Sequence, residues 1–184
     1  LFNIDLDIYV GQFQVSDPMF KRELRLTLED YHIYTVTPGI SNINLGYEKG
    51  VMITLGTNFG MTVVGEVVNG NGIGEADEKW RFDKDKYKDF MGRISQDIGD
   101  FATIGAFAYY GKEKLLPGED IPSLNEAFLW GPDLSIQLKK IIQLNVQYVQ
   151  RSDSRVLVAS DDEFMEQKDI ATYGAIGELI FTPK

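Results

Sequence analysis

The chain has 184 residues, of which 43% are hydrophobic, and its 28 acidic and 18 basic residues give a net charge of −10. This acidity argues against a nucleic-acid partner, which would need clustered Lys and Arg to neutralise phosphates. No run approaches the roughly 18 unbroken apolar residues of a membrane helix, and the absence of cysteine excludes a disulfide framework and thiolate metal ligands. The length suits one domain over residues 1–184.

Residues 2–13 alternate in character with the period of a β-strand. Ile4 and Leu6 are apolar, whereas Asp5 and Asp7 lie on the opposite face. Two carboxylates on one face are unfavourable in an apolar core but suit a water-filled lumen. The alternative is the wet face of a soluble antiparallel sheet.

Residues 14–39 interrupt this alternation. Lys21, Arg22 and Arg25 lie in a charge-dense run whose periodicity does not separate helix from strand. Connections of this length in compact proteins are usually functional. We therefore expect a loop here that can fold inward, into the lumen of a barrel.

Residues 89–112 form the clearest hairpin of the chain. Phe90 and Ile94 lie on one face of its first strand and Arg93 on the other, and its second strand is two-faced in the same way. The turn at residues 97–100 has the Asp and Gly residues that close a short hairpin. Long two-faced strands with short turns are what a transmembrane β-barrel requires.

The last strands also gather polar side chains on one face. Gln143, Asn145 and Gln147 alternate with apolar residues, and Glu178 alternates with Leu179. Amides and carboxylates on one strand face again indicate that this face is in contact with water. Eight strands are predicted in all: residues 2–13, 41–55, 61–69, 126–138 and 170–181, the two strands of the 89–112 hairpin, and the strand around residues 142–149.

The connections between these strands alternate in length. Short ones are predicted at residues 56–60, 97–100 and 139–140. Long polar ones, interpreted as outer loops, are predicted at residues 70–86, 113–125 and 152–168. This asymmetry is typical of outer-membrane barrels. We predict an all-β antiparallel transmembrane barrel. Because both ends of the sequence look cut, we expect these eight strands to be part of a larger barrel.

Short phrases follow one another along the chain in a characteristic order. They lie at residues 10–15 (VGQFQV), 47–52 (YEKGVM), 67–72 (VVNGNG), 88–95 (around a Gly-Arg pair) and 131–148. In this order they resemble strand phrases of the phosphate-selective porin O/P family. The resemblance implies an outer-membrane barrel of about sixteen strands, often trimeric, that conducts small solutes, and of which this chain would be roughly the middle half.

The same resemblance implies outer-membrane lipid, small solutes or ions and further copies of the chain as partners, and a location in the bacterial outer membrane. An associated envelope protein is the partner expected if the barrel is instead structural. Family members that select phosphate line the pore with Arg and Lys. This chain is acidic, and Gln14 stands where Lys is expected, so we do not expect phosphate selectivity.

Catalytic chemistry finds little support in the sequence. His32 is the only histidine, so neither a His-centred triad nor a multi-histidine metal site can be assembled. Asp83 and Asp85 are weak candidates for a Ca²⁺ site, since the EF-hand pattern is missing, and a solvated outer loop is the simpler interpretation. We expect no enzyme activity and no cofactor.

The sequence therefore predicts a channel for passive diffusion of small hydrophilic solutes or ions. Its basic cluster, set against inward carboxylates, could produce a transverse field across a constriction; alternatively the arginines pair with neighbouring acids and anchor the loop. The other functions considered are a structural barrel that holds a partner protein and a soluble ligand-binding β protein. The candidate lumen residues are Asp5, Asp7, Lys21, Arg22, Arg25, Glu66, Arg93, Gln143, Asn145, Gln147 and Glu178.

Overall fold

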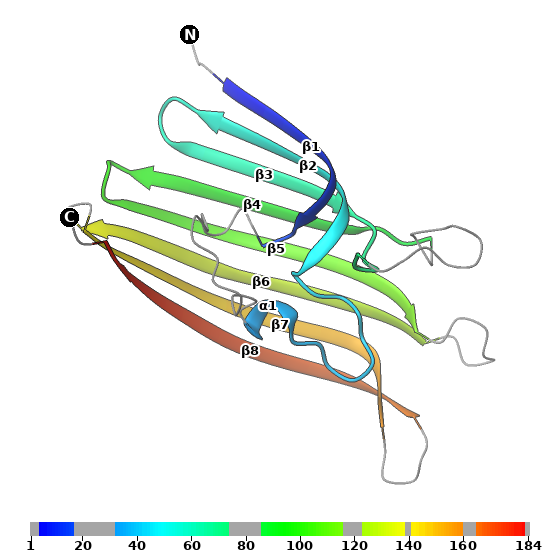
Figure 1. Ribbon diagram of the computed structural model, residues 1–184. Coiled ribbons are helices and arrows are strands. Elements are labelled where there is room, and N and C mark those ends of the chain that lie inside the picture. Colours follow the sequence, from blue (N-terminus) through cyan, green and yellow to red (C-terminus); the bar gives the residue numbers. More distant parts are fainter. Residues whose placement is uncertain are drawn as a thin grey trace.

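The computed structural model describes residues 4–16, 32–73, 86–115, 123–138, 141–159 and 165–182. These residues form one antiparallel sheet of eight strands whose order follows the chain (Figure 1), which confirms the all-β antiparallel prediction. The strands are β1 (Ile4–Gln14), β2 (Tyr47–Thr57), β3 (Met61–Val68), β4 (Asp89–Ile98), β5 (Ala102–Leu115), β6 (Ser123–Leu138), β7 (Ile142–Ala159) and β8 (Met165–Phe181). A four-residue helix, α1 (His32–Thr35), lies between β1 and β2.

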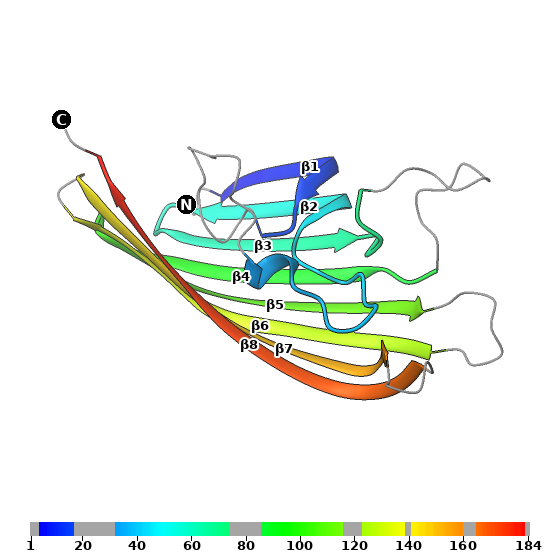
Figure 2. The ribbon, with the colours of Figure 1, turned by 60° about the horizontal axis from the view of Figure 1, so that its bottom comes forward.

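The sheet is strongly curved, and α1 lies on its concave side (Figure 2). Each strand pairs with its neighbours in the chain, so β1 and β8 occupy the two edges. The described strands thus form an open curved sheet, and closure into a barrel is not part of this fold. No helix in the described ranges is both long and apolar enough to cross a membrane.

Two of the predicted long loops are shorter in the structure. β5 continues to Leu115 and β6 starts at Ser123, while β7 continues to Ala159 and β8 starts at Met165. The strand ladder pairs Val156 with Lys168 beyond a register irregularity after Asp153. Backbone hydrogen bonds extend the strands there. The sequence does not predict these extensions, because the polar side chains do not alternate with apolar ones.

The predicted strand over residues 41–55 begins later, at Tyr47. In the preceding residues, the Asn44 Oδ1 accepts a hydrogen bond from the Gly46 N–H at 2.7 Å, and the Leu45 N–H donates to the Tyr34 carbonyl at 2.8 Å. These bonds fold residues 32–46, which we call the inner segment, back onto the concave face.

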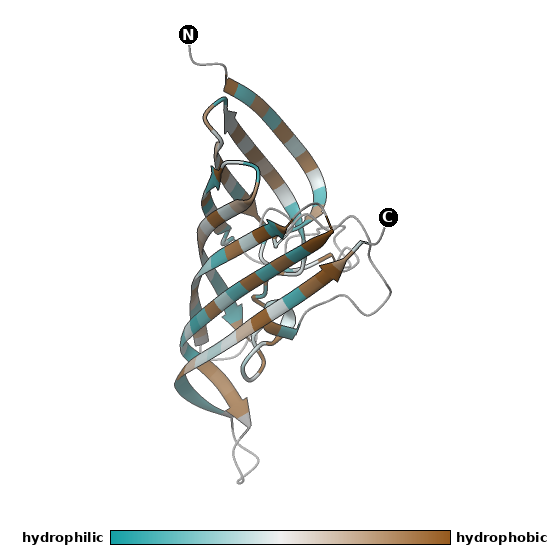
Figure 3. Cartoon of the chain, turned by 90° about the vertical axis from the view of Figure 1, so that its left-hand side faces the viewer, coloured by the Kyte–Doolittle hydropathy of each residue, from teal (hydrophilic) through white to brown (hydrophobic). Residues whose placement is uncertain are grey.

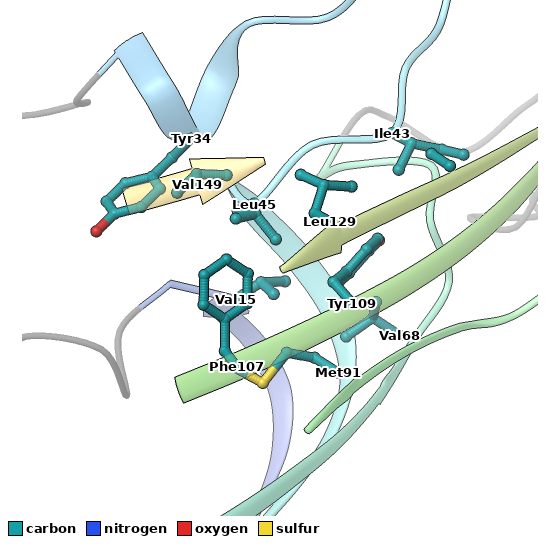
Figure 4. Packing of buried hydrophobic residues seen from close by; sticks show 11 residues of the cluster. Val15, Tyr34, Ile43, Leu45, Val68, Met91, Phe107, Tyr109, Leu129 and Val149 are labelled. Carbon is teal, nitrogen blue, oxygen red and sulfur yellow. The ribbon is translucent and has the colours of Figure 1, made fainter. Parts of the chain in front are cut away.

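The inner segment is held there by an apolar cluster (Figure 4). Tyr34, Ile43 and Leu45 from the segment pack with Phe107 and Leu129, which project from β5 and β6. All five side chains are buried. At about 25 cal/mol per Å² of apolar area removed from water, such packing is the main force that fixes the segment.

Candidate functional site

The two faces of the sheet differ in chemistry, and the strands alternate between hydrophobic and hydrophilic residues (Figure 3). We call the concave face, which carries Arg93, the inner face and its opposite the outer face. The strand register aligns one outer-face row of apolar side chains across the first six strands: Leu6, Leu55, Val63, Ile94, Ala106 and Pro132. Exposed apolar surface of this extent marks an interaction site.

The outer face carries a band without charged side chains, which runs across all the described strands and ends at a border on each side. On β6 the band runs from Phe128 to Leu138, and in the described strands no Asp, Glu, Lys or Arg faces outward between these levels. Many of its side chains are exposed, Val10 to 78% and Tyr173 to 83%. Charge begins just beyond the band, where Lys112 Nζ lies 2.6 Å from Glu126 Oε1.

Exposed aromatic rings mark both borders of this band. At the end of the sheet with the long connections they are Phe90, Tyr110, Phe128, Trp130 and Tyr173. At the end with the short turns they are Phe59, Phe101 and Phe181. Aromatic rings at two levels, separated by 9 to 11 strand residues, are the pattern expected at two membrane–water interfaces.

The inner face is rich in charge and polar groups. Up to the irregularity after Asp153, the register directs two guanidinium groups inward, Arg93 and Arg151. It directs ten carboxylates inward: Asp5, Asp7, Glu48, Glu66, Asp89, Asp97, Glu113, Asp133, Asp153 and Glu178. The inner wall is therefore strongly acidic.

Arg93, a predicted lumen residue, is buried and ion-paired on the inner face. Its Nη2 lies 2.6 Å from Asp133 Oδ1 and its Nε 3.3 Å from Asp133 Oδ2. The two residues project from β4 and β6, and Gly105 lies between them on β5; a Cβ there would stand 2.6 Å from the guanidinium and 2.7 Å from the carboxylate. The absent side chain of Gly105 is what lets the pair meet across a strand.

The predicted polar residues of the last strands form a hydrogen-bonded row. Asn145 accepts from Ser135 Oγ at 2.7 Å and from Gln143 Nε2 at 3.0 Å, and its own amide donates to Glu178 Oε2 at 2.8 Å. Gln147, the next inward residue, accepts a hydrogen bond from the Tyr34 hydroxyl of the inner segment. The row thus links β6, β7 and β8, and its neighbour Gln147 contacts α1.

Arg151 fastens the inner segment to the sheet. Two of its N–H groups donate to Asp153, at 2.5 and 2.7 Å, and a third donates to the Ser41 hydroxyl at 3.1 Å. The remaining two donate to the backbone carbonyls of Ile43 at 2.6 Å and Val36 at 3.2 Å. All five guanidinium donors are therefore used.

Glu113 completes this anchor from β5, which β6 separates from β7. It accepts from the Ser41 hydroxyl at 2.6 Å and from the Asn42 N–H at 3.0 Å, and the Asn125 amide donates to it at 3.1 Å. A carboxylate that accepts several donors makes strong, charge-assisted hydrogen bonds. Glu113 and Arg151 thus both hold the short stretch of residues 41–43 by hydrogen bonds.

The remaining predicted site residues lie in different surroundings. Asp5 and Asp7 face inward from β1 and are exposed, whereas Glu66 is buried on β3. Lys21, Arg22 and Arg25, and the weak metal candidates Asp83 and Asp85, lie outside the described residues.

The Arg151 anchor was not predicted from the sequence. Arg151 and Asp153 stand where the predicted last-but-one strand gives way to a predicted loop, and Glu113 opens another predicted loop. A guanidinium and a carboxylate two residues apart, on one strand face, were the available signal. In the described ranges, no three His, Asp or Glu side chains come together as a metal site.

Comparisons with known proteins identify no relative of the chain. No protein-family model, no curated protein and no solved structure matches it.

Proposed function

We propose that this chain forms the wall of a transmembrane β-barrel channel in the bacterial outer membrane, which passes small hydrophilic solutes or ions by diffusion. The single observation that carries this proposal is the contrast between the two faces. An uncharged, aromatic-bordered outer band stands against an inner face with ten carboxylates. Lipid outside and water inside account for both faces at once.

A soluble sheet would need a second layer over its outer face. In the described residues the inner segment covers the concave face only, and exposed apolar side chains continue from β1 to β8 on the other. A soluble ligand-binding protein of this composition would leave that band in water. The family that the sequence phrases resemble, the phosphate-selective porin O/P family, offers a functional analogy, without its selectivity.

One observation favours a second candidate function. The inner segment fills part of the concave face with a buried apolar cluster that includes Tyr34 and Phe107. A barrel closed by such a filling would not conduct and would serve as a structural element of the membrane, holding a partner protein. In this candidate function the chain still forms the wall of a barrel, but the lumen is filled instead of open.

The proposal is tested with the whole chain refolded into detergent and added to planar lipid bilayers. We expect folded protein that requires detergent, migrates differently on gels before and after heating, and inserts with stepwise increases in conductance. Folded protein in the membrane without steps would favour the structural barrel. A monodisperse, folded protein in buffer without detergent would rule out both barrel functions.

A further inference from the structure

The sign of the charge on the inner wall bears on which ions such a channel passes. Up to the irregularity after Asp153, the ten inward carboxylates outnumber the two inward guanidinium groups by eight. The entire chain, with a net charge of −10, has the same sign. Lumen walls of one sign concentrate ions of the opposite sign.

Both inward arginines are already engaged with carboxylates. Arg93 Nη2 lies 2.6 Å from Asp133, and Arg151 Nε lies 2.5 Å from Asp153, with all four side chains nearly inaccessible to solvent. A guanidinium held this closely by a carboxylate presents little net positive charge to an ion in the lumen. The arginines thus offer no binding site for an anion.

One inward carboxylate is buried with an oxygen that accepts no hydrogen bond from the described residues. Glu48 is fully buried at the start of β2, and its Oε1 accepts from the Gly72 N–H at 2.8 Å. Its Oε2 has no hydrogen-bond donor among the described residues. A buried carboxylate oxygen without a donor is costly unless a cation, water or proton satisfies it.

Asp5 and Asp7 carry the charge where the inner face stays open. They project inward from β1 opposite Gly56 and Thr54 of β2, are exposed, and stand away from the apolar cluster under the inner segment. An ion in the lumen would meet these two carboxylates in water. A carboxylate about 6 Å from an ion in water changes the local cation concentration about threefold.

We propose that the channel selects cations over anions, with Asp5 and Asp7 as the carboxylates that an ion passes in the open part of the lumen. This inference rests on the proposed function, since it concerns the same lumen. It assigns small hydrated cations, such as K⁺, as the favoured solutes, in contrast to a pore lined by Arg and Lys.

The test measures the zero-current potential of the reconstituted full chain in a KCl gradient, with K⁺ and Cl⁻ as the probes. We expect a permeability ratio of K⁺ to Cl⁻ above one, which falls severalfold in the double variant Asp5→Asn/Asp7→Asn. The matched control, Glu126→Gln/Asp169→Asn, removes two negative charges from the outer side of the strands and should leave the ratio unchanged. Screening at about 1 M salt should weaken the preference.

The possible results distinguish cation selection from the channel function on which it depends. Conductance steps with an anion preference, or a ratio that Asp5→Asn/Asp7→Asn leaves unchanged, would overturn cation selection and leave the channel intact. An equal fall in the outer-side control would show that total charge, and not the lumen wall, sets the ratio, and would also overturn it. Folded, inserted protein without steps would overturn the channel and the inference together.

Discussion

Arg151 forms hydrogen bonds that join distant parts of the described chain. It connects β7 to the backbone of residues 36 and 43 and to Ser41, and it pairs with Asp153 in a buried site. Removing one partner of a buried ion pair leaves the other charge uncompensated, at a cost of about 3–5 kcal/mol. The replacement Arg151→Met should lower the free energy of unfolding by about that amount, as measured by denaturant titration in detergent micelles.

The matched control for this change is Arg155→Met. Arg155 pairs with Glu126 at 3.4 Å, and its side chain is 49% exposed. Exposed pairs contribute about 0–1 kcal/mol, so this variant should unfold almost like the unchanged chain. If Arg151→Met were no more destabilising than Arg155→Met, the anchor assigned to the inner segment would be wrong.

For individual residues, the sequence predicts the direction in which a side chain points better than it predicts which residue that side chain contacts. Alternation alone places Arg93 inward, and it does the same for Asp133 on its own strand. That the two meet depends on the register of β4, β5 and β6 and on Gly105 between them. Register is set by many pairings at once, which no single strand pattern contains.

Among the elements, β3 offers the sharpest test of the two faces because adjacent residues point in opposite directions. Val63 lies in the outer row between Leu55 and Ile94, and Thr62 lies inward opposite Ser95. A lysine on the lipid side near the bilayer midplane costs about 2–4 kcal/mol, whereas lumen positions tolerate charge. Val63→Lys should therefore lower the free energy of unfolding in lipid vesicles far more than Thr62→Lys does.

The comparison is informative because both variants add the same charge one residue apart. In a soluble protein, Val63 would be a surface position, and lysine there would change stability by roughly 0.5 kcal/mol or less. Equal, small effects of the two variants would therefore contradict a lipid-facing outer side. The measurement needs no conductance and tests the band independently of the channel.

Elements were predicted well where alternation is regular and less well where it stops. The eight strands follow from period-two patterns, and the 97–100 turn from its Asp and Gly residues. The ends of β7 and β8 did not follow, because residues such as Ser152, Gln167 and Lys168 are polar and still pair with the neighbouring strand. Backbone hydrogen bonds, which side-chain patterns do not report, extend these strands.

For the whole molecule, the two edges of the sheet decide whether the wall closes. β1 and β8 each pair on one side only, and the exposed outer residues of β1 include Ile4, Leu6 and Ile8. An unpaired edge strand exposes backbone N–H and C=O groups, which in lipid cost several kcal/mol each. A sheet with this outer band is therefore expected to have both edges paired with further strands, as in a closed barrel.

This expectation can be checked by nuclear Overhauser contacts between Hα atoms in detergent micelles. Antiparallel neighbours bring Cα atoms to about 4.5 Å at every second pair, so β1 should show cross-strand contacts to a strand other than β2. β4, which pairs with β3 on one side and β5 on the other, provides the internal reference for a strand with two partners. If β1 contacts β2 alone while β4 shows contacts to both of its neighbours, the sheet is open at β1. An open sheet with this outer face is incompatible with a stable channel in a bilayer.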